Sequence, residues 1–297
     1  MYRTDMTDEP DRKAVFVTGA TGIVGSAVVR HLLTAGDAVI AAVRTPEDTT
    51  RVDRAATTRA FDFGAPVADH KKALAGCGRL FLMRPPPISD VRRYLFPVID
   101  AALEVGVKQI VFLSLQGVQH NTSTPHHAVE EYLRRVNAPY TFLRPNFFMQ
   151  NLSTTHRREI RDESEIFVPA GRSFTAFIDA DDIGRVAAAV FRGAGHLRQA
   201  YTLNGEQSLS YAKVARILSD VLGRPIRYAR PSEKEYLERI ARAGASDDYV
   251  QVQRMIYRIV RWNISAFPNR KIRTLTGRPA TTFREFAERE KAAWIPE

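Results

Sequence analysis

Cysteine is almost missing from this chain, and so are long apolar runs. Cys77 is the only cysteine among 297 residues, which excludes an internal disulfide and any metal site built from several cysteines. No apolar run approaches the roughly 20 residues that span a bilayer, and the first residues lack the apolar core of a secretory signal. We therefore expect a cytoplasmic protein that does not insert into a membrane.

Positive charge is in excess but is not concentrated. The formal net charge of +10 permits contact with nucleic acid. Basic residues are nevertheless spread among Asp and Glu, and the densest stretch is "RMIYRIVRWNISAFPNRKIR" at residues 254–273. We interpret it as an amphipathic helix and loop with a solvated arginine face, an anionic ligand or nucleic acid being the alternative. The expected partner is a small molecule and not a nucleic acid.

Short β-rich runs alternate with helical patterns through the first half of the chain. The runs are "AVFVT", "AVIAAV", "TRAFDF", "RLFLM", "QIVFLSL" and "YTFLRP". Such alternation predicts a parallel sheet covered on both faces, and Gly36 and Gly106 stand where two of the helices should stop. From Pro231 onward the pattern is largely helical. The predicted fold is α/β, a Rossmann-type doubly wound parallel sheet with a smaller, mostly helical C-terminal lobe.

Three glycines follow the first predicted strand in "TGATGIVG" and open the first predicted helix. The first glycine permits a sharp turn, the second lets the backbone approach a pyrophosphate, and the third allows the helix to pack closely on the strand. Free N–H groups at the helix start would face the phosphates. The segment predicts dinucleotide binding, close packing alone being the alternative. The residues assigned to it are Gly19, Thr21, Gly22, Ile23, Val24 and Gly25.

Arg44 ends the second predicted strand and selects the dinucleotide. An NAD site places Asp or Glu there to bind the ribose 2′-hydroxyl, whereas an arginine accommodates the 2′-phosphate of NADP. Glu47 and Asp48 lie beyond Pro46 and fit the start of a turn or helix. We therefore expect NADP(H), with a solvated surface arginine as the alternative interpretation of Arg44.

The domain division follows from these patterns. We expect a flexible N-terminus at residues 1–13 and an NADP-binding Rossmann core at residues 14–153. Residues 154–297 are expected to complete the sheet and to form a C-terminal substrate lobe.

Several segments together carry a resemblance to a known family. They are "TGATGIVG", "VR", "FDF", "SLQG", "HHAVEEYLRRVNAPYTFLRPNFFMQN" and "FIDADDIGRVAAAV". The chain resembles the NmrA-like family of atypical short-chain dehydrogenases/reductases from about Ala14 to Gly223. The most distinctive pieces are "YTFLRPNFFMQN" and "IDADDI", which a generic Rossmann sheet does not require.

The resemblance implies further residues of the cofactor site. Asp62 and Phe63 would flank the adenine, and the loop "MRPPP" would pass near the ribose and the nicotinamide. The residues that the resemblance places around the ribose and nicotinamide are Met83, Arg84, Pro85, Ser114, Pro145, Asn146 and Phe147. Phe148, Tyr257 and Trp262 are candidates for the substrate pocket, with simple core packing as the alternative for the last two.

A catalytic pair of the ordinary kind is missing. The typical short-chain enzyme carries Tyr-x-x-x-Lys on one helix, and this chain has His126 and Glu130 at the matching place. Spaced i and i+4, they would share a helix face, where the carboxylate would raise the histidine pKa and make it a general acid. The alternative is a helix-start histidine beside an ordinary ion pair. Ser114, His126 and Glu130 are the candidate catalytic residues.

Two other clusters are interpreted as structural. His120, His126 and His127 with Glu130 and Glu131 lack the spacing of a metal site, so no metal is expected. The carboxylates of "IDADDI" fit a turn before a helix, with Asp182 as the N-terminal cap.

The predicted function is an NADPH-dependent reductase that transfers hydride to a conjugated, electron-poor small molecule such as a quinone or aromatic metabolite. The alternatives are a non-catalytic NADP(H) sensor that binds a protein partner and a non-reductive enzyme that retains the cofactor fold. We expect a monomer or a homodimer.

Overall fold

The computed structural model describes residues 13–296, so all but Lys13 of the expected flexible N-terminus lies outside the described residues. The chain divides into two compact units. One runs up to Arg144 and also contains Ile183–Tyr201, and the other comprises Pro145–Asp182 and the chain from Thr202 onward. The first unit therefore takes back a segment from the second half of the sequence.

The first unit is built on strands that alternate with helices. Its elements in chain order are β1 (Ala14–Val17), α1 (Ile23–Thr34), β2 (Val39–Val43), η1 (Pro46–Arg51), β3 (Thr57–Ala60), α2 (Val67–Leu74), β4 (Cys77–Met83), α3 (Val91–Tyr94), α4 (Phe96–Glu104), β5 (Gln109–Leu113), η2 (Val118–His120), α5 (Pro125–Arg135), β6 (Tyr140–Pro145) and most of α8 (Ala180–Arg192). Gly36 and Gly106 follow α1 and α4 with φ of 80° and 81°, which confirms them as helix stops.

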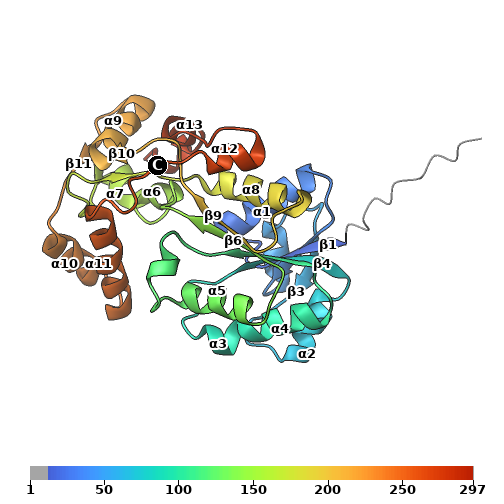
Figure 1. Cartoon of the computed structure of the whole chain (residues 1–297). Coiled ribbons are helices and arrows are strands. Elements are labelled where there is room, and N and C mark those ends of the chain that lie inside the picture. Colours follow the sequence, from blue (N-terminus) through green and yellow to red (C-terminus); the bar gives the residue numbers. More distant parts are fainter. Residues whose placement is uncertain (1–12, 297) are drawn as a thin grey trace, which may run out of the picture. The chain divides into compact units, whose positions relative to one another are not determined.

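The strands form one sheet in the order β3-β2-β1-β4-β5-β6-β9, where β9 is Gln199–Leu203. Every pairing from β3 through β6 is parallel. Helices α2, α4 and α5 cover one face, and α1 with α8 covers the other (Figure 1). Close packing of α1 on α8 requires Gly184, where a Cβ would lie 2.5 Å from a backbone atom of Ala27. The predicted doubly wound α/β fold is confirmed.

The order of the strands reverses between β1 and β4, because the chain moves outward through β2 and β3 before it returns to the other side of β1. Ligands of open α/β sheets bind beyond the carboxyl ends of the strands at such a switch point. The site is therefore sought around the residues that follow β1, β2, β4 and β5.

The second unit is mostly helical. Its elements are α6 (Gln150–Ser153), α7 (Arg157–Asp162), β7 (Glu165–Ile166), β8 (Phe174–Thr175), β10 (Leu209–Ser210), α9 (Tyr211–Leu222), β11 (Arg227–Tyr228), α10 (Glu233–Arg242), α11 (Asp247–Arg261), α12 (Lys271–Thr276), α13 (Phe283–Arg289) and η3 (Lys291–Trp294). Capping boxes begin α10 at Ser232 and α13 at Thr282, which satisfies N–H groups at both helix starts. Its apolar core includes the buried ring of Trp294, whose Nε1 donates to the Leu152 carbonyl at 2.8 Å.

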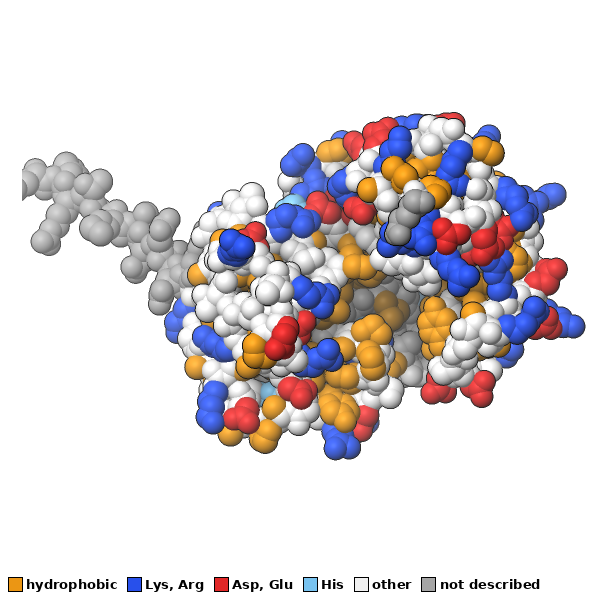
Figure 2. Space-filling view, turned by 180° about the vertical axis from the view of Figure 1, so that it is seen from behind, with side chains coloured by type: hydrophobic (Ala, Val, Ile, Leu, Met, Phe, Trp, Pro, Cys, Tyr) orange, Lys and Arg blue, Asp and Glu red, His pale blue; other side chains and the backbone are white. Residues whose placement is uncertain are grey.

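The charged surface is mixed in sign. Figure 2 shows Lys and Arg side chains interspersed with Asp and Glu over the visible face. The predicted amphipathic helix of the basic stretch is present as α11, where Arg254 and Arg258 both lie within ion-pair distance of Glu233. Within the described part of the chain, no helix is both long enough and apolar enough to cross a membrane.

Candidate functional site

The turn between β1 and α1 has the geometry of a phosphate cradle. Gly19 has a φ of +64°, a left-handed conformation that glycine adopts without strain. A Cβ on Gly25 would lie 2.0 Å from the Gly19 carbonyl oxygen, and one on Gly19 would lie 2.2 Å from the Met83 sulfur. Gly22 begins the helix with no side-chain cap among the described contacts, so backbone N–H groups remain for an anion. The cradle fits a pyrophosphate.

Arg44 directly follows β2, at the place where a 2′-phosphate would be bound. Its side chain is exposed and forms no ion pair with any residue that the structure describes. A second guanidinium, which sequence reasoning missed, belongs to Arg51 at the end of η1. Its Nη2 donates to the Thr21 carbonyl of the glycine turn at 3.2 Å. Arg51 also lines a cavity of about 200 Å³ beside this turn, together with Ala20, Ser26, Val29, Arg30, Val52 and Asp53.

Arg51 was hard to find in the sequence because it lies beyond Pro46 and seven positions after Arg44. The only signal was a basic residue in the last turn of a short helix after the second strand. Its closeness to Thr21 depends on how η1 folds back along the sheet. Both guanidinium groups could therefore contact a phosphorylated ribose.

The segment after β3 holds the residues expected at the adenine. Asp62 is exposed, and its Oδ1 accepts a hydrogen bond from the Gly64 N–H at 2.9 Å. Phe63 is half-buried and meets the Phe61 ring edge-on, with centroids 5.0 Å apart. These contacts fix the local turn and leave the second carboxylate oxygen of Asp62 without a hydrogen bond among the described contacts, so the adenine contacts stay a prediction.

The loop after β4 is organised by Arg84. Its Nη1 donates to the carbonyl oxygens of Pro85, Pro86 and Ile88 at 3.1, 2.9 and 2.6 Å. The side chain is half-buried, and burial lowers its pKa. No carboxylate pairs with Arg84 among the described residues, and its Nε is buried without a partner there. Arg84 thus shapes its own loop and keeps an uncompensated positive charge.

Glu130 on α5 is the centre of a buried ion network. Ser114, directly after β5, donates its hydroxyl to Glu130 Oε1 at 2.7 Å. Arg144 Nε in β6 donates to the same oxygen at 2.9 Å, and Arg134 Nη2 donates to Oε2 at 2.8 Å. The carboxylate therefore anchors α5 to the ends of two strands. It holds the Ser114 proton, so this hydroxyl is left to accept hydrogen bonds from a ligand.

The expected pairing of His126 with Glu130 is wrong. The two residues share α5 at i and i+4, but Glu130 turns to Ser114 and the arginines and makes no bond to His126 among the described contacts. Burial and then the charge of Arg84 lower the pKa of His126 to about 3, where a paired carboxylate would have raised it. His126 is neutral at pH 7 and does not act as an imidazolium acid.

The neighbouring histidine has a structural role. His127 Nδ1 lies 3.1 Å from the Val118 carbonyl oxygen. The backbone N–H of His127 donates to the Thr124 hydroxyl that caps α5. Across residues 13–296, no three His, Cys, Asp or Glu side chains gather as a metal ion would require. The absence of a metal stays a prediction.

The residues after β6 lie in the second unit and are used internally. Asn146 Nδ2 donates to the carbonyls of Ala176 and Ser265 at 3.0 and 2.8 Å, and its Oδ1 accepts from the Phe147 N–H. Pro145 is buried and Phe147 half-buried. The Asn146 side chain thus links three segments by hydrogen bonds, and both polar atoms of its amide are occupied. Its predicted contact with the cofactor would therefore have to come from its backbone.

The three candidate pocket residues differ in burial. Tyr257 lies in the core of the second unit, where its hydroxyl is 3.1 Å from His156 Nε2. Trp262, by contrast, is 71% exposed. Phe148 is half-buried and bridges to Ile178. The core alternative therefore describes Tyr257, while Trp262 and Phe148 keep surface for a ligand.

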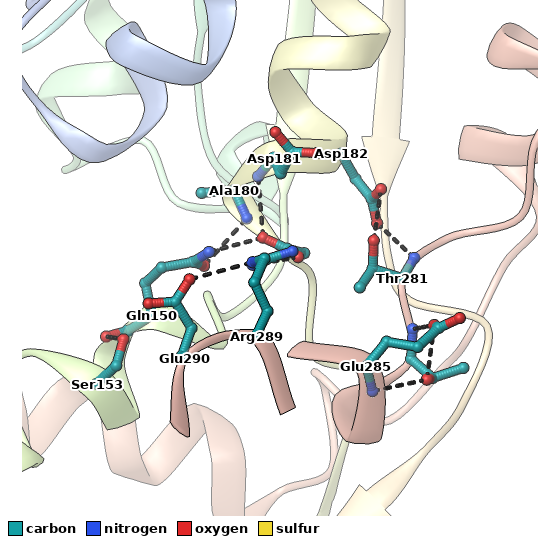
Figure 3. A network of polar contacts seen from close by, with 11 residues as sticks. Gln150, Ser153, Ala180, Asp181, Asp182, Thr281, Glu285, Arg289 and Glu290 are labelled. Carbon is teal, nitrogen blue, oxygen red and sulfur yellow. Dashed lines mark hydrogen bonds and ion pairs between the residues drawn. The ribbon is translucent and has the colours of Figure 1, made fainter. Parts of the chain in front are cut away.

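The carboxylates before α8 are structural, but the predicted cap is wrong. Asp179 Oδ1 accepts from the Asp181 N–H at 3.0 Å and from Gln150 Nε2 at 2.6 Å. Asp182 instead binds the Thr281 N–H and hydroxyl, as Figure 3 shows. Because α8 begins at Ala180, the residue placed to cap it is Asp179.

Comparisons with known proteins agree with this architecture. The model of the NmrA-like family matches residues 11–287. An NAD(P)H azoreductase from Xenophilus azovorans is 31% identical over 287 residues, which cover 94% of this chain and 99% of that protein. Citrobacter sp. triphenylmethane reductase complexed with NADP(H) is 25% identical with a TM-score of 0.81, covering 93% of this chain and 99% of that chain.

An NADPH-dependent quinone oxidoreductase from Escherichia coli is 24% identical, with a TM-score of 0.81 over 93% of this chain and 98% of that chain. At that identity the likeness supports the fold alone. The family is NAD(P)-binding, in agreement with the glycine cradle, and the prediction of NADP(H) as cofactor is confirmed at this level. The match over nearly the whole length shows that the chain belongs to the NmrA-like family and is an NAD(P)H-dependent oxidoreductase of the atypical short-chain dehydrogenase/reductase type.

Proposed function

We propose that this protein is an NADPH-dependent reductase that transfers hydride to a conjugated, electron-poor small molecule such as a quinone or aromatic metabolite. The observation that carries the proposal is the state of the side chains after β5 and at the start of α5. His126 is kept neutral, and the Ser114 hydroxyl donates its hydrogen bond to Glu130. A site without a side-chain acid suits acceptors whose reduction needs no proton from the enzyme.

The preference for the phosphorylated cofactor rests on Arg44 and Arg51. The bound cofactor supplies the hydride, and the residues of the chain bind and orient it. The glycine cradle would hold the pyrophosphate, and the two guanidinium groups would hold the 2′-phosphate. Ser114 would accept a hydrogen bond from the nicotinamide end, because its own proton is directed at Glu130.

Relatives support a flat, conjugated acceptor. The Xenophilus azovorans relative is named for azo reduction, and the Citrobacter neighbour for the reduction of triphenylmethane compounds. In this chain, exposed aromatic side chains suited to such a molecule stand on the second unit. Trp262 and Phe267 are 71% and 70% exposed, and Phe174 is also exposed. We assign the apolar surface for the substrate to Phe148 and Trp262, with Tyr257 supporting from the core.

We also place the protein in the cytoplasm, where NADPH is supplied and a lone thiol stays reduced. Cys77 is buried, and burial raises its pKa, so its thiol is unreactive. Whether the protein acts as a monomer or a homodimer stays a prediction.

The test is loss of dihydronicotinamide absorbance when the purified protein is mixed with NADPH and a panel of quinones, azo compounds and triphenylmethane dyes. NADH and a Gly22→Asp variant serve as controls. A Cβ at Gly22 meets only the Gly19 carbonyl, at 3.3 Å, so the aspartate acts chiefly by repelling phosphate. Turnover that prefers NADPH and vanishes in the variant supports the proposal. Tight NADPH binding without oxidation by any acceptor would favour the sensor alternative.

A further inference from the structure

Arg84 and Ser114 directly follow β4 and β5, and with His126 in the first turn of α5 they are here called the strand-end group. Met83 and Leu113, the last residues of these strands, are register partners in a parallel pair. The backbones of Arg84 and Ser114 therefore lie side by side at the carboxyl end of the sheet, where neighbouring strands are about 4.8 Å apart. His126, in the first turn of α5, lies beside β5, where its ring centroid is 6.1 Å from that of Phe112, and the charge of Arg84 contributes to lowering its pKa.

The same edge is where the cofactor's reactive end is expected. The glycine turn packs against the Met83 side chain, so the loop headed by Arg84 adjoins the phosphate cradle. Ser114 lies at the same carboxyl end of the sheet, one strand further along, after β5. A ligand that runs from the cradle along the carboxyl ends of the strands passes the strand-end group.

Arg84 has a positive charge without a counter-charge. Among residues 13–296 it pairs with no carboxylate, and only its Nη1 is engaged, with three carbonyl oxygens of its own loop. A partly buried charge is costlier to leave unpaired than an exposed one. An anion that arrives beside it is attracted strongly, because the surrounding protein screens charge less than water does.

Neither neighbour of Arg84 can neutralise an anion by giving it a proton. The hydroxyl proton of Ser114 is held by Glu130, and His126 is a neutral imidazole at pH 7. Within the strand-end group, the guanidinium of Arg84 therefore offers positive charge for stabilising negative charge, and no member of the group acts as an acid. This combination favours a substrate on which negative charge appears during the reaction.

We infer that Arg84 stabilises the negative charge that develops on a neutral acceptor, so that this protein reduces quinone-type acceptors in preference to cationic dyes. The inference rests on the proposed reductase function and names its substrate class. A quinone that accepts a hydride becomes a hydroquinone monoanion: one oxygen carries the transferred hydrogen and the other the negative charge. Water then supplies the proton. A triphenylmethane cation that accepts a hydride at its central carbon becomes neutral, and the guanidinium repels it beforehand.

The two acceptor types should respond differently to Arg84→Gln, and this difference is the test. We expect kcat/KM for a neutral quinone to fall by about a hundredfold, the lower end of the range for loss of one donor to a developing oxyanion. For a cationic triphenylmethane dye it should stay constant or rise. The matched control is Arg92→Gln, which removes the same charge from an exposed arginine of α3 and should change neither acceptor.

NADPH affinity is measured in parallel by titration of protein fluorescence, and folding by thermal unfolding. The resemblance places Arg84 near the cofactor, but its Nη1 donates only to carbonyls of its own loop, so we expect the Kd for NADPH to be unchanged in Arg84→Gln. Arg84→Lys keeps the charge but breaks the contacts to the loop carbonyls, and it should restore the ratio of quinone to dye reduction. Where the native protein reduces only the quinone, the fall in quinone kcat/KM at unchanged NADPH affinity is the deciding result.

Three results would overturn the inference alone. An equal loss with both acceptors and weaker NADPH binding would make Arg84 a cofactor contact. An equally large loss in Arg84→Lys would show that loop geometry and not charge matters. No loss in Arg84→Gln would show that the charge is unused. A native protein that oxidises NADPH with neither acceptor would instead overturn the proposed function, and the inference with it.

Discussion

Two groups of polar side chains in this molecule each contain an arginine, and among the described residues that arginine is paired with a carboxylate in one group and unpaired in the other. Around Asp179 in the second unit, each oxygen of the buried carboxylate has a partner: Gln150 and a backbone N–H on one side and Arg289 at 2.8 Å on the other. In the strand-end group of the first unit, the guanidinium of Arg84 forms no ion pair with a carboxylate of any described residue.

The difference separates structural polar groups from ligand-binding ones. A fully satisfied buried network stabilises the fold and has no donors or acceptors left for a ligand. A half-buried cation without an anion costs stability in the isolated protein, a cost that a bound ligand can offset. Mutations in the first network should therefore act on unfolding, and mutations around the ligand site on binding and rate.

The largest expected effect is that of Asp179→Ala on stability. It leaves the Nε2 of buried Gln150 without its acceptor and removes the ion pair to Arg289, which should lower the free energy of unfolding by about 3 kcal/mol. Urea unfolding followed by circular dichroism measures it. Asp220→Ala is the control, because the exposed pair of Asp220 with Arg284 contributes less than about 1 kcal/mol. If Asp179→Ala and Asp220→Ala lowered the free energy of unfolding equally, the Asp179 network would not be a special source of stability.

The next effect is acid sensitivity of the second unit through His156. Burial lowers the pKa of His156 to about 4 from an ordinary value of 6.5, so the unfolded chain binds a proton that the folded one refuses. Stability is therefore intact above pH 6.5 and falls as the pH drops toward 4.

We expect the part due to His156 to be about 1.5 kcal/mol between pH 6.5 and about pH 5. His156→Gln should flatten the decline by that amount in urea unfolding at several pH values, while His120→Gln, at an exposed histidine, should not. His126 contributes in the same direction, because its pKa is also lowered. A variant that declines as steeply as the native protein would contradict the burial argument.

A smaller effect is expected at the cofactor end of the ligand site. Arg44→Ala should weaken NADPH binding about tenfold and leave NADH binding unchanged, because only NADPH carries the phosphate that the guanidinium would bind. Isothermal titration with both cofactors measures the ratio. Arg54→Ala, at another exposed arginine nearby, is the control. An equal loss for both cofactors would refute the assignment of Arg44 to the 2′-phosphate.

The smallest expected effect is that of Ser114→Ala. Glu130 keeps Arg144 and Arg134, so the free energy of unfolding should fall by only about 1 kcal/mol. KM for NADPH should rise a few-fold at a nearly constant kcat, because an acceptor for the cofactor is lost and no acid is removed. A variant that loses the rate but not the affinity, with an altered pH profile, would make Ser114 a proton donor after all.

Much of the first unit was predictable because its signals are local. Alternating strands and helices give the sheet, and the glycine spacing gives the turn at Gly19 and Gly25, since each depends on residues within about 20 positions. The place of Arg44 after β2 was predictable for the same reason. The family resemblance added the segments after β3, β4 and β6 as candidates, without the contacts their side chains make.

The pairings among these residues were not predictable. Helical spacing placed His126 and Glu130 on one helix, but besides Arg134 of the same helix the partners of Glu130 are Ser114, just after β5, and Arg144 of β6, up to 16 positions away. Arg51 reaches Thr21 across 30 positions. Trp262 and Tyr257 have the same apolar character in the sequence, and only the packing of α11 buries one and exposes the other.

The sequence by itself determined the architecture, the phosphate cradle and the class of cofactor, because backbone conformation and hydrophobic periodicity are written in neighbouring residues. The tertiary structure alone decided which charges are neutralised. Glu130 and Asp179 form ion pairs with arginines, whereas Arg84 pairs with no carboxylate among residues 13–296. The physical reason is that Coulomb energy and desolvation depend on distance and burial in space, and neither quantity follows from separation along the chain.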